Sequence, residues 1–212
     1  MFSDILSHND RMSVHFFIGN AIGFFVFLFV FWKRLKEDYI SSQVFSTSFS
    51  IVLGIILFNI LARIFFPTWW FWASFVGVLA GFVVGLLRFK LRVLETIQAL
   101  LIALLPWLGL NYLVHAIGNS NLISFLASMT VWLLIGFYLL VEAHYKRFTW
   151  YQSGKIGFSG LATAGLFFLI RATVAVFMND VISFSGKSEP YLSAVVAFVF
   201  FLALFNLVGR RT

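Results

Sequence analysis

The chain has 212 residues, of which 61% are apolar, 11% are charged and none is cysteine. A soluble domain carries about 25% charged residues, so the charges here are too few to cover a water-facing surface, and most of that surface must contact lipid. The net charge of +7 does not indicate nucleic-acid binding, because the basic residues lie in short clusters between apolar runs, as membrane topology signals do. The absence of cysteine excludes disulfides, thiolate metal sites and a cysteine nucleophile.

Apolar runs of membrane-spanning length recur along the whole chain. A helix needs roughly 20 apolar residues to cross the hydrocarbon core, which is about 30 Å thick. The sequence therefore predicts an all-α integral membrane protein with a single transmembrane domain over residues 1–212, and no cofactor or metal site is expected. In chain order, the seven predicted spans are about Val14–Trp32, Val44–Ala62, Trp69–Leu87, Val93–Ile117, Leu122–Val141, Ile156–Met178 and Tyr191–Val208.

The first span and the boundary between the fourth and fifth need separate arguments. The uncharged run Met12–Trp32 is longer than the apolar region of a signal peptide, and its basic cluster follows the run instead of preceding it. It is therefore predicted to be a membrane helix. The uncharged stretch Thr96–Val141 is too long for one crossing, and the turn signal Gly118–Asn121 divides it into two spans.

The basic residues predict the orientation. Eleven Lys and Arg residues fall in connections on one side of the predicted bundle, and three fall on the other side. The eleven are Lys33, Arg34, Lys36, Arg88, Lys90, Arg92, Lys146, Arg147, Lys155, Arg210 and Arg211. The three are Arg11, Arg63 and Lys187. By the positive-inside rule, the N-terminus is predicted to lie outside the cytoplasm and the C-terminus inside.

Small residues recur at helical spacing in two spans. The spacings Gly77/Gly81/Gly85 and Ala162/Gly165 allow neighbouring helices to approach closely. The alternative is that these glycines have no special partner, since glycine is frequent in membrane helices.

Arg171 is the one basic residue inside a predicted span, with 15 uncharged residues before it and eight after it. An arginine at mid-bilayer costs on the order of 2.5–3.5 kcal/mol on insertion scales, so it usually has a water-filled pocket or an anionic partner. Two interpretations stay open. Its long side chain reaches the outer interface, roughly 10 Å away, or it lines a functional pocket.

Arg63 and two histidines also map to the outer half of the membrane. Two guanidinium groups can grip one phosphate, so Arg63 and Arg171 are predicted to bind the phosphate of an anionic lipid headgroup. An ordinary interfacial arginine is the alternative for Arg63. The catalytic residues are unknown; His15 and His115 are the candidates for a base, although each alone is more often a packed or interfacial histidine.

The remaining polar residues have simpler interpretations. Trp69, Trp70 and Trp72 follow Arg63 and are typical of an interfacial aromatic belt. Glu95 is predicted to pair with Arg92, three residues earlier on the same helix face. Two acids near the start of the last span, Asp180 and Glu189, are predicted to be solvated. No glycine-rich phosphate loop, His-Glu-x-x-His motif or nucleophile elbow appears in the sequence.

Four segments of the chain resemble, in the same order, four motifs of one known family. They are His15–Phe17, Leu61–Phe65, Ser74–Gly81 and Gly154–Arg171. In that order they resemble the His/Arg-Trp-Tyr opening, the Gly-Gly-Arg-Ile-Gly-Tyr segment, the Ser-Phe-His-Gly-Gly-Leu-Ile-Gly motif and the Gly-Gln-x-Phe-Gly…Arg segment of the bacterial prolipoprotein diacylglyceryl transferase family. The seven-helix arrangement with the N-terminus outside is also that of the family. The chain departs from the family where Val76 replaces the motif His and Phe17 the motif Tyr.

The resemblance implies a function and a site. Members of the family move a diacylglyceryl group from phosphatidylglycerol to the lipobox cysteine of a prolipoprotein in the bacterial cytoplasmic membrane. It implies phosphatidylglycerol and a prolipoprotein signal peptide as partners, with Arg63 and Arg171 as the cradle of the phosphate leaving group. Whether the chain transfers the group is left open. The alternatives are a catalytically inactive lipid-binding or scaffold homologue and a small transporter, which is disfavoured because seven spans do not divide into equal repeats.

Overall fold

The computed structural model describes residues 2–144, 156–178 and 180–209, and within these ranges it describes side chains from residue 17 to residue 208. The described residues form helices joined by turns and short irregular segments, without strands. Its seven α-helices are α1 (Phe2–Leu35), α2 (Ser41–Phe65), α3 (Trp70–Phe89), α4 (Val93–Asn119), α5 (Leu122–His144), α6 (Phe158–Phe177) and α7 (Glu189–Gly209). Two short 3₁₀ turns, η1 (Pro67–Trp69) and η3 (Gly186–Ser188), precede α3 and α7.

All seven helices are long and apolar enough to cross a membrane, which confirms the prediction of a helical, multi-pass protein. Six predicted spans lie inside the observed helical segments. The sixth helix is slightly shorter than predicted because it begins after Gly157, whose φ of 102° lies outside the helical region. The predicted turn after Gly118 is also confirmed, since α4 ends at Asn119 and Ser120 has a left-handed φ of 50°.

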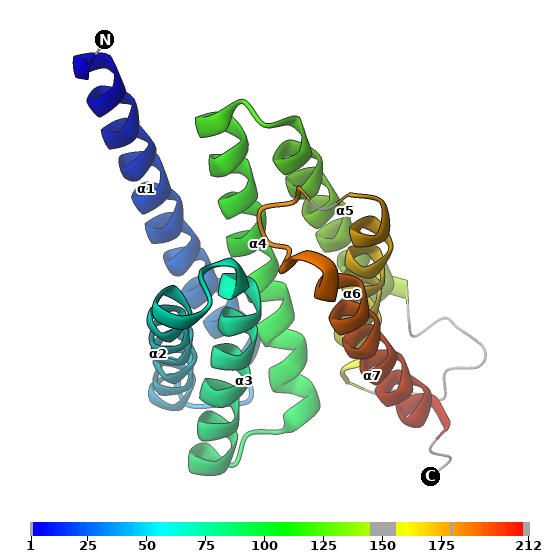
Figure 1. Ribbon diagram of the computed structural model, residues 1–212. Helices are drawn as coiled ribbons and strands as arrows, with labels where there is room; N and C mark the ends of the chain where they lie inside the picture. The colour runs from blue at the N-terminus through cyan, green and yellow to red at the C-terminus, as the bar shows by residue number, and fades with distance from the viewer. Residues whose placement is uncertain (1, 145–155, 179, 210–212) are drawn as a thin grey trace.

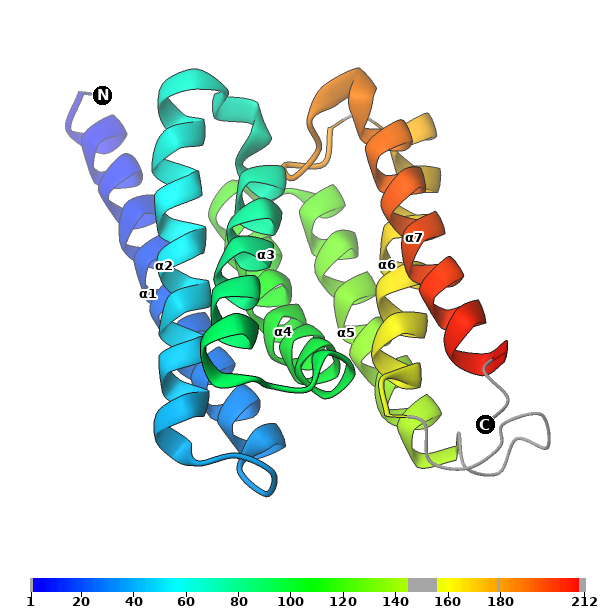
Figure 2. The ribbon, with the colours of Figure 1, turned by 90° about the horizontal axis from the view of Figure 1, so that it is seen from below.

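Successive helices run in opposite directions, and α4 lies at the centre of the bundle (Figures 1 and 2). It packs against α1, α5 and α6, while α2 pairs with α3 and α6 pairs with α7. The α1–α2 and α3–α4 connections lie together at one end, here called the basic end. The α2–α3, α4–α5 and α6–α7 connections lie at the other, here called the Arg63 end.

The α2–α3 pair packs through glycine. A Cβ atom on Gly77 would lie 2.5 Å from the carbonyl oxygen of Gly54, and a Cβ on Gly54 would lie still closer to the backbone of Gly77. Gly81 lies against the backbone of Ile51 in the same way. The close approach that the glycine spacing predicted is therefore confirmed for this pair.

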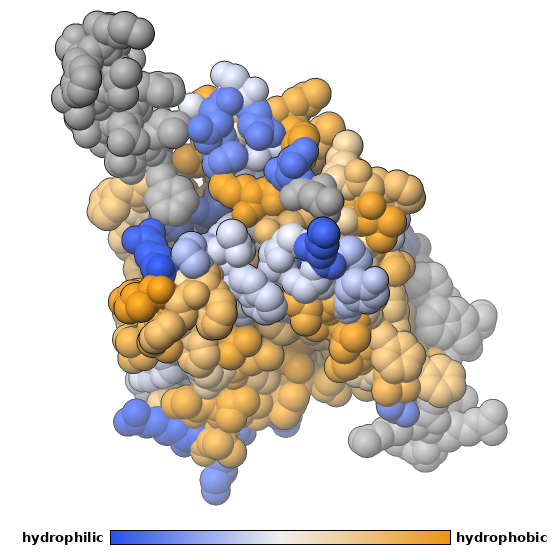
Figure 3. Space-filling model, in the orientation of Figure 1, coloured by the Kyte–Doolittle hydropathy of each residue, from blue (hydrophilic) through white to orange (hydrophobic). Residues whose placement is uncertain are grey.

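The outer surface of the bundle is largely apolar. In Figure 3 an orange, hydrophobic band separates blue, hydrophilic regions at the top and bottom of the visible face. Large side chains such as Phe25, Leu57, Leu133 and Phe198 are exposed on different helices. A soluble protein rarely exposes so much contiguous apolar surface, and here lipid can cover it.

Candidate functional site

Arg171 lies on α6, in the half of the bundle nearer the Arg63 end, and only 4% of it is exposed. Its Nε and Nη2 atoms donate hydrogen bonds to Oε1 of Glu189, at 3.1 and 2.5 Å. Nη1 donates to Oγ of Ser183 at 2.8 Å and to the hydroxyl of Tyr112 at 3.3 Å. Nη2 also donates to the carbonyl oxygen of Ser183 at 3.1 Å. A guanidinium group has five N–H donors, and these five bonds use all of them.

Glu189 begins α7 and is completely buried, so the prediction of a solvated acid was wrong for this residue. Besides Arg171, its Oε1 accepts a bond from Ser193 at 2.7 Å. Its Oε2 accepts bonds from Trp72 Nε1 at 2.8 Å and from the backbone and side chain of Ser185, both at 3.1 Å. A carboxylate in the first turn of a helix is also stabilised by the helix dipole. Asp180, by contrast, is exposed as predicted.

Aromatic rings complete the environment of Arg171. Its Cζ atom lies 3.6 Å from the centre of the Phe71 ring and 5.0 Å from that of Phe184. Such cation–π contacts are worth about 2 kcal/mol when the cation is desolvated. Trp72 is buried and bonded to Glu189, so it does not belong to an interfacial belt, whereas Trp69 is exposed as a belt residue would be.

These contacts bear on the interpretations of Arg171 that the sequence left open. The side chain does not extend to the interface, because it is buried and an anionic partner within the protein holds it. The cluster joins α3, α4, α6, α7 and the segment between the last two. We call Arg171, Glu189, Ser183, Tyr112 and Trp72 the Arg171 cluster.

The structure does not bring Arg63 and Arg171 together. Arg63 is exposed at the end of α2 and makes no hydrogen bond or ion pair with any described residue. His115 is partly buried, and its Nδ1 lies 2.8 Å from Oγ of Ser124, at the α4–α5 connection. The side chain of His15 lies outside the described residues. No contact joins His115 to Arg171, so the predicted site residues do not form one constellation.

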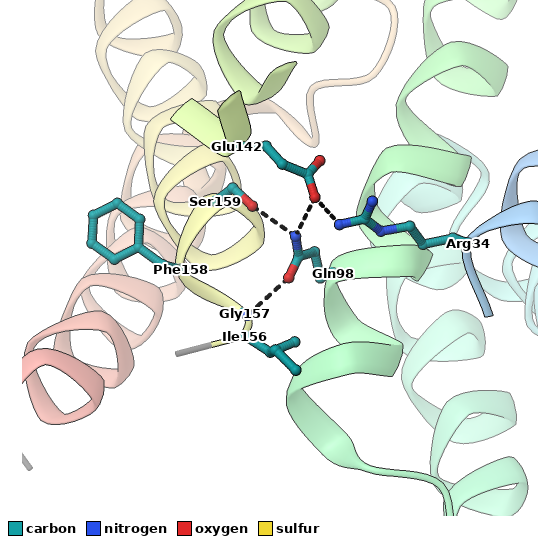
Figure 4. A pocket seen from close by; sticks show the side chains of 7 residues that line it. All are labelled: Arg34, Gln98, Glu142, Ile156, Gly157, Phe158 and Ser159. Carbon is teal, nitrogen blue, oxygen red and sulfur yellow. Dashed lines mark hydrogen bonds and ion pairs between the residues drawn. The ribbon is translucent and has the colours of Figure 1, made fainter. Parts of the chain in front are cut away.

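A second polar cluster, missed by the sequence analysis, lies at the basic end (Figure 4). Its centre is the buried Gln98 of α4, whose Nε2 lies 2.8 Å from Ser159, 3.1 Å from Tyr138 and 3.2 Å from Glu142. Its Oε1 accepts a bond from the backbone N–H of Gly157 at 2.8 Å. The side chain thereby ties α4 to α5 and to the start of α6.

Beside Gln98 is a hollow of about 60 Å³. An ion pair between Arg34 of α1 and Glu142 of α5 lies at this hollow (Figure 4). The space is large enough to hold water. Gln98 carries a detectable sequence signal, because it is a polar residue within the long uncharged stretch.

The connections at the basic end are joined by Tyr39. Its hydroxyl donates to Glu95 at 2.9 Å and accepts a bond from the backbone N–H of Arg92 at 2.9 Å. Burial raises the pKa of the Tyr39 hydroxyl, the Arg92 N–H opposes the rise, and Glu95 adds to it. The net rise favours the protonated form that donates to Glu95. The predicted Arg92–Glu95 ion pair is confirmed at 2.9 Å.

No protein-family model, curated protein sequence or solved structure matches the chain.

Proposed function

We propose that this chain is a membrane protein of the diacylglyceryl transferase type that binds anionic phospholipid but does not transfer its diacylglyceryl group. Of the alternatives that the sequence left open, this is the inactive, lipid-binding homologue. The observation that carries it is the complete use of the Arg171 N–H groups inside the protein. A transferase needs free donors where charge develops on the leaving phosphate, and Arg171 has none to offer.

The positions described for a possible base support the same conclusion. Val76, at the position that resembles the family's motif histidine, is 44% exposed on the outside of α3. A base at this position would point away from the bundle interior. His115, the described candidate, lies near the α4–α5 connection and makes no contact with Arg171. Deprotonation of an acceptor thiol requires a base within hydrogen-bond reach of the reacting group.

Arg63 remains the contact for a lipid phosphate. It is exposed and unpaired among the described residues, and the exposed rings of Phe65, Phe66 and Trp69 lie next to it in the chain. An arginine among aromatic rings at a helix end is suited to the headgroup region. Because basic residues favour the cytoplasmic side, the Arg63 end faces the outer leaflet of a bacterial cytoplasmic membrane. Phosphatidylglycerol is the proposed ligand.

A bacterium depleted of its own transferase is expected to remain unable to grow when it produces this chain. The reason is that Arg171, whose N–H groups are all bonded inside the protein, has no donor left for the leaving phosphate. Growth and the lipid modification of a reporter prolipoprotein are the measurements, and the host transferase produced at the same membrane level is the positive control. Rescue by the wild-type chain, abolished by Arg171→Ala, would overturn the assignment of an inactive protein.

Replacing Arg63 with glutamine is expected to weaken phosphatidylglycerol binding about fivefold, since one interfacial cation contributes about 1 kcal/mol near an anionic surface. Native mass spectrometry of the full chain, taken from vesicles that contain phosphatidylglycerol and phosphatidylcholine, measures the retained lipid. Lys187→Gln, which removes another exposed cation at the same end, is the matched control. If both variants retain as much phosphatidylglycerol as the wild type, Arg63 is not the contact.

A further inference from the structure

Four exposed cations at the basic end have no anionic partner among the described residues: Lys33, Lys36, Arg88 and Lys90. We call them the basic-end cluster. They come from the end of α1, the end of α3 and the connections that follow these helices. The Tyr39 hydrogen bonds to Glu95 and Arg92 hold those two connections against each other. The four cations therefore share one end of the fold although they are far apart in the sequence.

The neighbouring arginines differ from this cluster because their charges are already compensated. Arg34 pairs with Glu142, and Arg92 pairs with Glu95. Two exposed carboxylates, Glu37 and Asp38, lie in the α1–α2 connection and make no ion pair with a described residue. Four cations against two carboxylates leave an excess of two positive charges.

Aromatic rings support three of the four cations. The Nζ atom of Lys33 lies 5.8 Å from the centre of the Phe29 ring, and that of Lys36 lies 5.4 Å from Trp32. The guanidinium of Arg88 lies 5.4 Å from Phe89. Aromatic rings with cations beside them are typical of the membrane–water interface, where the cation reaches the phosphate level while its stem stays in apolar surroundings.

We infer that the basic-end cluster is a second docking surface, which binds anionic phospholipid headgroups in the leaflet opposite to that of Arg63. The occupant is set by charge: uncompensated cations at the depth of the lipid phosphates attract anionic headgroups more strongly than zwitterionic ones. This surface is separate from Arg63 and independent of whether the chain transfers a lipid group.

The test uses the full chain taken from vesicles that contain phosphatidylglycerol and phosphatidylcholine, with retained lipid measured by native mass spectrometry. The variant Lys33→Gln/Lys36→Gln/Arg88→Gln/Lys90→Gln is expected to lower the preference for phosphatidylglycerol by about tenfold or more. The variant Glu37→Gln/Asp38→Asn is expected to raise that preference, because it removes the two opposing charges. Unfolding temperatures are measured to check that both variants fold, which is expected because the substituted positions are exposed.

The outcomes separate this surface from the Arg63 site. The variant with all four cations replaced should keep the lipid bound at Arg63. Arg63→Gln should keep the lipid bound at the basic-end cluster. The inference is overturned if the fourfold variant keeps the wild-type preference for phosphatidylglycerol, or if Glu37→Gln/Asp38→Asn lowers that preference. If only Arg63→Gln retains as much phosphatidylglycerol as the wild type, the proposed function is contradicted and this inference is not.

Discussion

Replacing Arg171 with glutamine is expected to lower the free energy of unfolding by about 3–5 kcal/mol, because it leaves Glu189 as an uncompensated charge inside the bundle. Glu189→Gln is expected to have an effect of the same order, since it strands the guanidinium. In Arg171→Gln, Ser183 and Tyr112 would also lose the hydrogen bonds that they accept from the guanidinium. Thermal unfolding of the purified chain in detergent, followed by circular dichroism, measures both effects.

Arg63→Gln is the matched control, because it removes the same charge at an exposed position without a described partner. Its effect on stability should stay within about 0.5 kcal/mol. Equal and small losses for Arg63→Gln and Arg171→Gln would mean that Arg171 is not held by Glu189 in the folded protein.

Replacing Gly77 with leucine is expected to separate α2 from α3 and to cost about 3 kcal/mol, the upper part of the range for overpacking. The first added atom would lie 2.5 Å from the carbonyl oxygen of Gly54, which is backbone and cannot rotate away. The helices must therefore move apart and lose contacts along their shared face. The unfolding temperature in detergent is the measurement.

Gly136 on α5 offers the control for that substitution. A Cβ atom there would meet nothing within 4 Å. Gly136→Ala is therefore expected to leave the stability unchanged or to raise it by up to about 1 kcal/mol, because alanine is the better helix former. Comparable losses at Gly77 and Gly136 would show that the α2–α3 contact is not the cause.

The helices could be predicted because length and apolarity alone determine them. Each apolar run of about 20 residues can satisfy its backbone hydrogen bonds in a membrane only as a helix. The turn at Gly118–Asn121 and the Arg92–Glu95 pair were also predictable, because both depend on residues close in sequence. The orientation of the bundle across the membrane stays a prediction.

The Arg171 cluster could not be predicted in the same way. Glu189 lies 18 residues after Arg171, and the segment between them must fold back before Ser183 and Glu189 can reach the guanidinium. One local signal was present: Glu189 and Ser193 are four residues apart and share a helix face. Trp72 shows the same limitation, since its bond to Glu189 joins residues 117 positions apart.

The difference between Arg63 and Arg171 could also be seen only in the structure. Both are single arginines in apolar surroundings, and the sequence alone made them equivalent candidates for one phosphate. Burial separates them, because one is enclosed with a carboxylate while the other is exposed at a helix end. Among the described residues, Arg63 therefore supplies the one guanidinium at this end of the bundle that is free to bind a lipid.

The claim that Arg171 pairs with Glu189, and does not bind a lipid phosphate, is tested most directly by a double-mutant cycle. The unfolding free energies of the wild type, Arg171→Gln, Glu189→Gln and the double variant are measured under one condition. The structure predicts that the double variant is more stable than the summed single losses imply, by about 3 kcal/mol. Losses that add to within about 0.5 kcal/mol would contradict the pairing and return Arg171 to the candidates for lipid binding.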